Sequence, residues 1–314
     1  MKFLFSTWVA VLVFLLWGNI CFGDTPSTKT NSLPLQIADS DWQPLRDQLD
    51  PELQNRLMAH VQRKGKVWRS LLEKNRLSVG IVDLTDEQNP RFAHINGDEM
   101  MYAASLPKIA ILLAMHHSIE AGKLSVTPEL RADMGNMIRF SDNAAATRLI
   151  DYLGFEGIEK VLCDSTLKLY DPEYGGGLWV GKRYARRGPR NPDPLEGLSH
   201  AATVNQVCRF YYLLAYGRLV SEERSKEMLK DMSNPGIHHK FVGSLETLAP
   251  DATLYRKSGT WRNWHSDSVL VWEHNDNGRR YILVGMVEYS HGGMMLKDLV
   301  PTVEEVLRPS IVAE

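Results

Sequence analysis

The sequence predicts an α+β fold, in which a mostly antiparallel sheet is flanked by helices and an all-helical lobe is inserted between its strands. Three observations support this prediction. Short segments rich in β-branched residues occur early and again late in the chain, the long stretch between them has mostly helical periodicity, and helical patterns precede the first strands and follow the last. The early and late strands form one sheet if the helical block loops out as a lobe.

The composition is that of an ordinary globular protein. The chain has 314 residues, of which 44% are hydrophobic and 24% charged. This length suits one large domain or two closely packed subdomains. The formal net charge of -2 offers no basic excess, so we expect no nucleic-acid partner.

The N-terminus has the order of an export signal. Lys2 is followed by an apolar run from Trp8 to Trp17 and by small residues near Gly23, which predicts a signal peptide over 1–23. The alternative is an uncleaved anchor, because the segment from Phe3 to Phe22 is just long enough to span a bilayer. We favour cleavage, and expect an exported protein, periplasmic or secreted, without stable membrane insertion. Residues 24–43 are rich in Thr, Ser, Pro and Asn and are predicted to be a flexible leader.

The remaining residues, 44–314, are expected to form the folded domain. Apolar residues recur at helical spacing over 44–75, with a break at Pro51. Leu77–Leu84 is predicted to be a strand, and Arg91–Ile95 could be its hairpin partner. Helical patterns then run from Leu106 to about Tyr216, so the helical lobe is placed at about 105–222.

The end of the chain returns to strands. Ser268–Glu273 and Arg280–Tyr289 flank a loop with Asn277-Gly278, a strong hairpin pair. A last amphipathic helix is expected from Pro301 to Leu307, with the proline in its first turn. After signal removal two cysteines remain, Cys163 and Cys208, which either pair or stay as two separately buried thiols.

A serine and a lysine stand three residues apart where an apolar helix is expected to begin. Ser105 and Lys108 would share one face of that helix, near free N–H groups and the positive end of its dipole. A desolvated Lys108 loses its proton more easily and can then activate Ser105 as a nucleophile. The alternative is a plain N-cap serine followed by a solvated lysine.

Ser141-Asp142-Asn143 precedes another helical pattern. An N-cap is one interpretation of these residues. The other is a hydroxyl, Ser141, that relays a proton to a leaving nitrogen beside an amide, Asn143, that orients the substrate.

Lys257-Ser258-Gly259-Thr260 lies ahead of a predicted strand. A solvated strand end is one interpretation. In the other, Gly259 lets a substrate approach the backbone, Lys257 and Ser258 hold a carboxylate, and the N–H of Thr260 stabilises an oxyanion.

These three motifs, in this order, resemble those of the serine β-lactamase and penicillin-binding protein family, and most closely class A β-lactamases. The resemblance covers roughly 77–307. Within it, Ser118–Ser125 resembles the end of the family's nucleophile helix, and Ala202–Ser221 resembles the helix after its omega loop.

The resemblance implies a β-lactamase/transpeptidase-type fold and acyl transfer through a serine ester. It makes Ser105 the acylated nucleophile, Lys108 its base or relay, Ser141 the proton shuttle and Asn143 a contact to the substrate amide. The substrate carboxylate and carbonyl are bound by Lys257, Ser258, Gly259 and Thr260.

Hydrolysis of β-lactams is the first expectation for the activity. A D-Ala-D-Ala carboxypeptidase or other serine peptidase, and a penicillin-binding domain that acylates without turnover, are the alternatives. We expect a monomer with no cofactor or metal, whose partner is a small-molecule β-lactam or a peptidoglycan-type peptide.

Two features depart from class A. The 36 positions from Ser105 to Ser141 are fewer than expected, which indicates a missing loop and a more open cleft. The Glu-x-x-Leu-Asn stretch, whose glutamate activates the deacylating water, is not found. After Asp171, the segment up to residue 202 offers Glu173, Asp193 and Glu196, of which Glu196 is our candidate base, with Glu173 or no base as alternatives.

The same segment carries a basic run, Lys182, Arg183, Arg186, Arg187 and Arg190. Either it is a solvated loop or it attracts anionic substrates.

Overall fold

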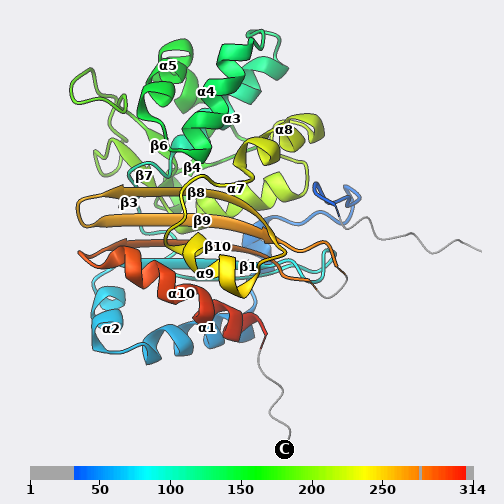
Figure 1. The fold of residues 1–314 in the computed structure, drawn as a ribbon, viewed down its shortest axis with the longest axis vertical. Helices are drawn as coiled ribbons and strands as arrows, with labels where there is room; N and C mark the ends of the chain where they lie inside the picture. Colours follow the sequence, from blue (N-terminus) through cyan, green and yellow to red (C-terminus); the bar gives the residue numbers. More distant parts are fainter. Residues whose placement is uncertain (1–31, 276–277, 309–314) are drawn as a thin grey trace, which may run out of the picture. The chain divides into compact units, whose positions relative to one another are not determined.

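The computed structural model describes residues 32–275 and 278–308. Its central feature is a five-stranded sheet with the order β2-β1-β10-β9-β8, in which neighbouring strands are antiparallel (Figure 1). Its strands are β1 (Leu77–Asp83), β2 (Arg91–Ile95), β8 (Thr253–Trp261), β9 (Trp264–Trp272) and β10 (Arg280–Glu288). The predicted α+β class and the hairpin between β1 and β2 are confirmed.

Between β2 and β8 the chain forms most of its helices. They are α3 (Lys108–Glu120), α4 (Pro128–Arg139), α5 (Asn143–Leu153), α6 (Phe155–Leu162), α7 (Val204–Ala215), α8 (Glu222–Met232) and α9 (Phe241–Leu248). Short strands accompany them: β3 (Met101–Tyr102), β4 (Tyr170–Asp171), β5 (Gly176–Gly177), β6 (Trp179–Val180) and β7 (His200–Ala202), with a 3-10 turn, η2 (Pro172–Tyr174). The inserted helical block was predicted. The short strands were not, because two or three residues are too few to show a strand periodicity.

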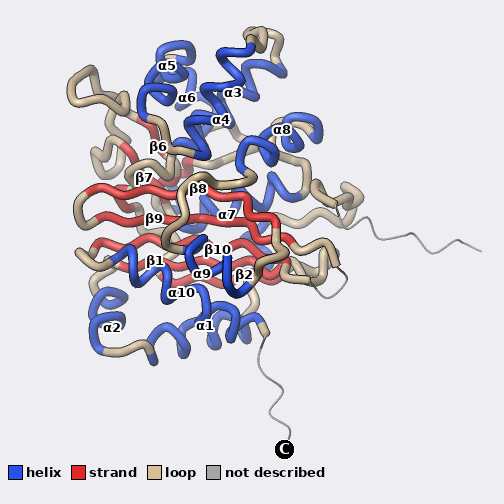
Figure 2. Tube along the Cα trace, viewed as in Figure 1, coloured by secondary structure: helices blue, strands red, loops and turns tan. Residues whose placement is uncertain are grey.

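Helices cover both faces of the sheet. One face carries α1 (Pro51–Arg63), α2 (Lys66–Glu73), α9 and α10 (Gly292–Leu307), and the other carries α7 with the rest of the helical lobe beyond it (Figures 1 and 2). The alternation along β10 shows this directly: Leu283 belongs to the hydrophobic cluster under α10, whereas Ile282 and Val284 belong to the cluster under α7. The sheet is therefore the middle layer of the domain.

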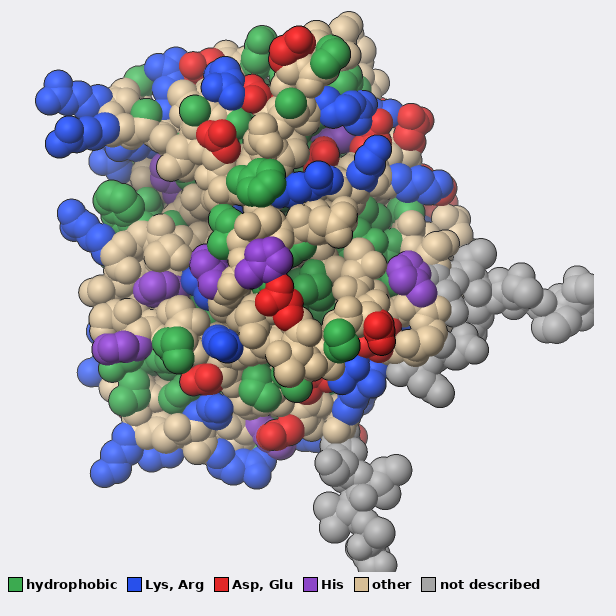
Figure 3. All heavy atoms as spheres, viewed as in Figure 1, with side chains coloured by type: hydrophobic (Ala, Val, Ile, Leu, Met, Phe, Trp, Pro, Cys, Tyr) green, Lys and Arg blue, Asp and Glu red, His purple; other side chains and the backbone are tan. Residues whose placement is uncertain are grey.

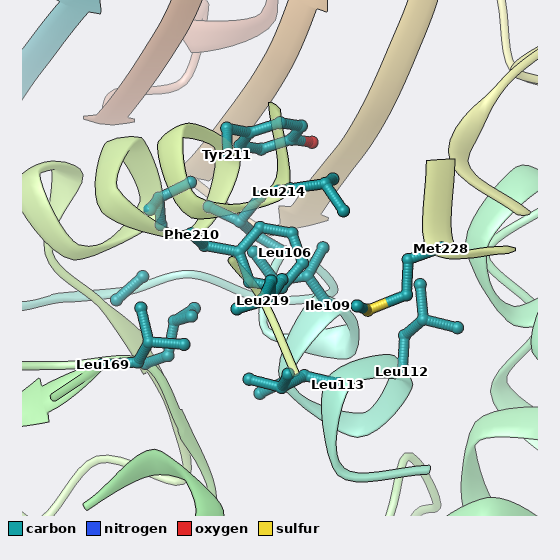
Figure 4. Close-up of a cluster of buried hydrophobic side chains, with 14 of the residues drawn as sticks. Leu106, Ile109, Leu112, Leu113, Leu169, Phe210, Tyr211, Leu214, Leu219 and Met228 are labelled. Carbon is teal, nitrogen blue, oxygen red and sulfur yellow. The ribbon is translucent and has the colours of Figure 1, made fainter. Parts of the chain in front are cut away.

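Helix α3 is the core of the lobe. Its residues from Ile109 to Met115 are fully buried, as expected of a helix that is apolar on all sides. Figure 4 shows Leu106, Ile109 and Leu113 packing against Phe210 and Leu214 of α7, with Met228 of α8 alongside. This packing fixes the position of the segment that precedes α3, which carries Ser105.

Three elements differ from their predicted limits. The stretch 44–75 contains a 3-10 turn, η1 (Leu45–Gln48), before α1, and Gly65 separates α1 from α2. Strand β9 begins at Trp264, because the tight turn after Trp261 continues β8 directly into it. The pair Trp272↔Arg280 closes the predicted last hairpin, and its residues 276–277 lie outside the described part.

Helix α10 is longer than predicted, and Pro301 lies in its interior rather than in its first turn. The prediction failed because Gly292 and Gly293 begin the helix despite their low helix propensity. Pro301 has no N–H to donate to the carbonyl of Lys297. The hydroxyl of Ser244 on α9 donates to that carbonyl instead, at 2.8 Å.

The predicted signal peptide and the alternative anchor lie outside the described residues. The described end of the expected leader, residues 32–43, is packed rather than free: Leu35 is buried and donates its N–H to Ala215 at 2.7 Å, and Trp42 stacks on Tyr212. In the described part of the chain, no helix has the length and apolarity to cross a membrane.

The two cysteines are free thiols. Cys208 is buried, and burial raises the pKa of its thiol well above the usual value. Cys163 is exposed, so the two cysteines neither pair nor are both buried.

Candidate active site

Ser105 lies in a tight turn just before α3 rather than in the helix itself. The N–H of Leu106 donates to Ala103, and that of Lys108 donates to Ser105, at 3.1 and 3.3 Å. The N-cap of α3 is Pro107, which offers no side-chain cap. Ser105 is half-buried, and no described residue hydrogen-bonds its hydroxyl, so this serine does not cap the helix.

Lys108 is fully buried at the first position of α3. Its Nζ donates to Ser141 O at 2.7 Å, to Ser141 Oγ at 3.3 Å and to Asn143 Oδ1 at 2.7 Å. Burial lowers the pKa of Lys108 to about 7, against the opposing effect of the Asp142 carboxylate. A neutral amine is therefore accessible near neutral pH, as a general base requires.

The residues of the second motif have two roles: Asp142 caps a helix, and its two neighbours contact Lys108. Asp142 is the N-cap of α5, and its Oδ1 accepts from Ala144 N at 2.7 Å and from Ala145 N at 3.0 Å. Ser141 has φ 57°, a left-handed conformation that is uncommon outside glycine. The capping interpretation thus holds for Asp142, while Ser141 and Asn143 are directed to Lys108.

The third motif lies within β8, at the edge of the sheet. Lys257 is buried, and its Nζ donates to Ser141 Oγ at 3.0 Å and to Ser258 O at 2.7 Å. Burial lowers the pKa of Lys257 well below its usual value, and the charge of Lys108 adds to this effect. A solvated strand end does not describe Lys257; instead, the hydroxyl of Ser141 lies between two buried lysines.

Gly259 lies against the backbone of the Ser105 turn. A Cβ at Gly259 would come within 2.6 Å of Ser105 N and 2.3 Å of Ala103 O, which no side chain can do without displacing the backbone. The structure therefore brings the N-terminal side of α3 next to β8. The motif residues Ser105, Lys108, Ser141, Asn143, Lys257 and Gly259 are joined by these contacts, and Ser258 and Thr260 flank them on β8.

Lys240, which the sequence analysis did not single out, completes this edge. It is the N-cap residue of α9, and its Nζ donates to Gly259 O at 2.6 Å, to Thr260 Oγ1 at 2.8 Å and to Ser266 O at 3.0 Å. Burial lowers the pKa of Lys240 to about 8, and the carboxylate of Asp267 opposes this. A lone lysine some twenty positions from the motif carries no sequence pattern that reveals this contact.

A buried ion pair supports the same edge from behind. Arg256 donates from Nε and Nη2 to the two oxygens of Asp267 at 2.7 and 2.8 Å, and both side chains are almost fully buried. Asp267 also accepts from Phe241 N at 3.2 Å. The pair therefore ties β8, β9 and the first turn of α9 together.

Four rings form a wall along the other side of the Ser105 turn, which we call the aromatic wall: Tyr184, His200, Tyr102 and Trp264. The Tyr184 ring lies 4.4 Å from Lys108 Nζ and 4.3 Å from the His200 ring, and its hydroxyl donates to Ala104 O at 3.3 Å. The 171–202 segment therefore places a phenol ring against the ammonium group of Lys108.

The acidic residues of that segment do not join the site. Glu196 and Glu173 are exposed, and Glu196 donates its backbone N–H to Asp193. Asp193 is buried but serves the loop itself, accepting from Leu195 N at 3.0 Å and from Tyr170 OH at 3.3 Å. Within 32–275 and 278–308, no acidic side chain hydrogen-bonds to Lys108, Ser141 or Asn143. The assignment of Glu196 as a base stays a prediction, without a contact that supports it.

The basic run of the same segment lies mostly in solvent. Arg186, Arg187 and Arg190 are exposed, whereas Arg183 pairs with Asp151. In the described part of the chain, no group of three or more His, Cys, Asp or Glu side chains is placed to hold a metal ion.

The sheet, the inserted lobe and the site between them define the β-lactamase/transpeptidase-type fold. The sequence matches the profile of the Beta-lactamase enzyme family over residues 66–134 and 128–305, and the chain belongs to this family. The resemblance inferred from the three motifs is confirmed. A search among curated proteins finds no match.

Solved structures share the fold at low sequence identity. A β-lactamase from Sphaerobacter thermophilus DSM 20745 is 17% identical over 81% of this chain and 98% of its own, with a TM-score of 0.62. PBP-A is 18% identical over 87% and 98%, with a TM-score of 0.59. A PBP-A mutant described as an acyl-enzyme complex with penicillin G has a TM-score of 0.61, at 18% identity over 84% and 98%. An ancestral class A β-lactamase is 17% identical over 81% and 99%, with a TM-score of 0.59.

Proposed function

We propose that this protein forms an acyl-enzyme on Ser105 with carboxylate-bearing amides, namely β-lactams or D-alanyl peptides. The observation that carries the proposal is the hydroxyl of Ser141 between Lys108 Nζ at 3.3 Å and Lys257 Nζ at 3.0 Å, next to a serine whose hydroxyl is free. Two buried lysines around one hydroxyl are costly to fold, because each loses its hydration. A role in proton transfer explains why the protein keeps the two lysines around the Ser141 hydroxyl.

In the proposed reaction, neutral Lys108 takes the proton of Ser105 as Ser105 Oγ bonds to the substrate carbonyl carbon. The N–H groups of Ser105 and Thr260 stabilise the oxyanion, and the contact of Gly259 with Ser105 N supports their closeness. The amide C–N bond then breaks, and the proton passes from Lys108 through Ser141 Oγ to the leaving nitrogen. Lys257 and Ser258 hold the substrate carboxylate.

Slow deacylation is part of the proposal. Fast hydrolysis of the ester needs a base that activates water. Glu196 and Glu173 are exposed, and a phenol ring covers Lys108 on the side of the 171–202 segment. These observations favour an enzyme that acylates readily and releases the acyl group slowly over a rapid β-lactamase. Rapid β-lactam hydrolysis remains the second candidate, favoured by the class A layout of the three motifs.

The natural setting follows from the sequence. We infer export to the periplasm or the exterior from residues 1–23, with the leader joining the signal to the domain over 44–314. We also propose that the protein acts as a monomer.

Intact-protein mass spectrometry after exposure to penicillin G tests the proposal. The wild-type protein should gain the mass of the ring-opened antibiotic at Ser105, and Ser105→Ala should gain none while keeping its thermal unfolding midpoint. The Ala variant removes only a hydroxyl that no described residue bonds, so the fold has little reason to change. An adduct on another residue of the variant, or no adduct on the wild type, would refute the assignment.

A further inference from the structure

Residues 182–190, in the loop between β6 and β7, carry an excess of positive charge that Asp193 and Glu196 later in the same loop balance only in part. Five of the nine residues over 182–190 are Lys or Arg, and none is acidic. Arg186, Arg187 and Arg190 are exposed, and among the described residues they have no ion-pair partner. Figure 3 shows Lys and Arg side chains standing out at the upper left, where Figure 1 places this loop beside α5.

The acidic side chains near the loop contact groups other than the three exposed arginines, although only Asp151 has a charged partner among them. Asp151 pairs with Arg183, Glu159 accepts from Asn191 Nδ2 at 2.9 Å, and Asp193 accepts several N–H groups of its own loop. The three exposed arginines are thus left to solvent or to a ligand.

The loop is closed at its base and attached to the active site. Lys182 and Arg190 form an isolated bridge, and Asn191 N donates to Gly181 O at 2.7 Å. Between these ends, Tyr184 bonds to Ala104 O and covers Lys108. Arg186 and Arg187 follow Tyr184 by two and three residues, so their backbones lie within about 11 Å of the residue that lines the site.

The field of the loop reaches the aromatic wall. The pKa of His200 is lowered to about 4, first by burial and further by the charges of Lys182, Lys108 and Arg190, against a raising effect of the hydrogen bond to Lys182 O. Within the candidate site, Lys240 Nζ has no carboxylate bonded to it in the described structure, and its pKa of about 8 keeps it charged at neutral pH.

We propose that residues 182–190 form an anion-binding rim of the active site, and that the natural substrate carries a second carboxylate beyond the one held at Lys257. This rests on the proposed acylation of Ser105. A rim of exposed arginines without ion-pair partners among the described residues raises the local concentration of an anion and its rate of association, and the effect falls with salt. A peptide substrate with an acidic side chain or a second free carboxylate has the required chemistry.

Two chromogenic cephalosporins that differ only in a distal carboxylate or carboxamide on the acyl side chain test the proposal. The rate constant measured is that of Ser105 acylation at low substrate. At low ionic strength the carboxylate probe should react about tenfold faster with the wild type, and the advantage should shrink as salt rises. The Arg186→Ala/Arg187→Ala/Arg190→Ala variant should lose the advantage, and its rate with the carboxamide probe should fall much less, because that probe carries one carboxylate instead of two.

A matched variant, Lys66→Ala/Lys74→Ala/Lys297→Ala, removes the same charge from exposed positions in the layer formed by α2 and α10. It should keep the wild-type preference. The proposal of an anion-binding rim is wrong if the arginine variant keeps the preference for the carboxylate probe. It is also wrong if the arginine and lysine variants lose that preference equally.

Failure of the proposed function gives a different result, in which neither probe acylates the wild-type protein. In that case equilibrium binding of the two probes, followed by calorimetry, decides. A carboxylate preference that the arginine variant abolishes supports the rim, and equal affinities refute it.

Discussion

At the scale of single residues, the candidate site contains lysines in three different surroundings. Lys108 contacts Asn143 and Ser141, Lys257 contacts Ser141, and Lys240 contacts the backbone of β8. The motifs predicted the first two because they are local patterns of residue type and spacing. Lys240 and Tyr184 reach the site through the fold, from segments without a pattern, so the sequence did not reveal them.

Asp142→Asn should move the pH dependence of acylation. The proposed base is neutral Lys108, so the rate should rise with pH through about 7 and level off above it. The Asp142 carboxylate raises the pKa of Lys108, so its removal should shift the midpoint to lower pH. Asparagine is as good an N-cap as aspartate, which leaves α5 intact.

The pH profile of the acylation rate measures this effect. Lys257 is the other candidate for the titration, and its pKa is set mainly by burial and by the charges of Lys108, Arg256, Asp267 and Lys240. A midpoint that stays in place in Asp142→Asn would therefore assign the titration elsewhere.

Lys240→Met should slow acylation while the protein stays folded. The ammonium of Lys240 bonds Gly259 O, and the same peptide group supplies the N–H of Thr260, the proposed oxyanion donor. A cation on the carbonyl polarises the peptide and orients its N–H, because hydrogen bonds in a chain strengthen one another. Loss of one charge-assisted hydrogen bond is worth about 1.5–3 kcal/mol, so a loss of at least tenfold is expected.

Stopped-flow acylation with one β-lactam, together with Lys240→Arg as the conservative variant, checks this role. The arginine should restore part of the rate because it keeps the charge and the donors. A purely structural role would instead lower the unfolding midpoint of Lys240→Met and leave the rate of the folded fraction unchanged.

At the scale of elements, the strands were predicted best where both faces of the sheet are covered. β1 and β10 appear in the sequence as apolar runs because α7 covers both strands on one side, while α2 covers β1 and α10 covers β10 on the other. The start of α10 was missed because its two glycines disfavour a helix, and the residues that stabilise it, such as Met295 and Leu296, act through packing on β9 and β10. Local helix propensity does not include this packing against the sheet, so the sequence pattern did not predict where α10 begins.

The edge strand β8 is held by the buried pair of Arg256 and Asp267. Arg256→Met leaves Asp267 buried without its counter-charge, so the free energy of unfolding should fall by about 3–5 kcal/mol. Arg148→Met is the matched control, because its pair with Asp133 is half-exposed and worth about 1 kcal/mol or less.

Urea denaturation of the two variants measures the difference. Equal losses would mean that the buried pair does not hold the edge of the sheet. Since Asp267 also binds the first N–H of α9, a weakened pair should slow acylation as well, through Lys240.

At the scale of the whole molecule, charge is distributed unevenly. The formal net charge is -2, yet three lysines are buried in the site and exposed arginines stand on the loop beside it. The total charge therefore predicted nothing about the site. What the sequence did predict was a departure from class A in the segment after α6. In the structure, the side chain of that segment that lies against Lys108 is Tyr184, and Glu173 and Glu196 are exposed.

Single-turnover deacylation of the Ser105 ester tests that departure. Glu196→Gln and Glu173→Gln should both deacylate at the wild-type rate, because each carboxylate is exposed and hydrogen-bonds neither Lys108 nor Ser141 in the described structure. The wild-type adduct should persist long after free β-lactam is removed, and intact-mass spectra over time follow it. A slower release in only one variant would identify that glutamate as the water-activating base and would place its loop against Ser105 during the reaction. Fast release in the wild type and in both variants would mean that Lys108 or another group activates the water, and that the Tyr184 ring does not keep water from the ester.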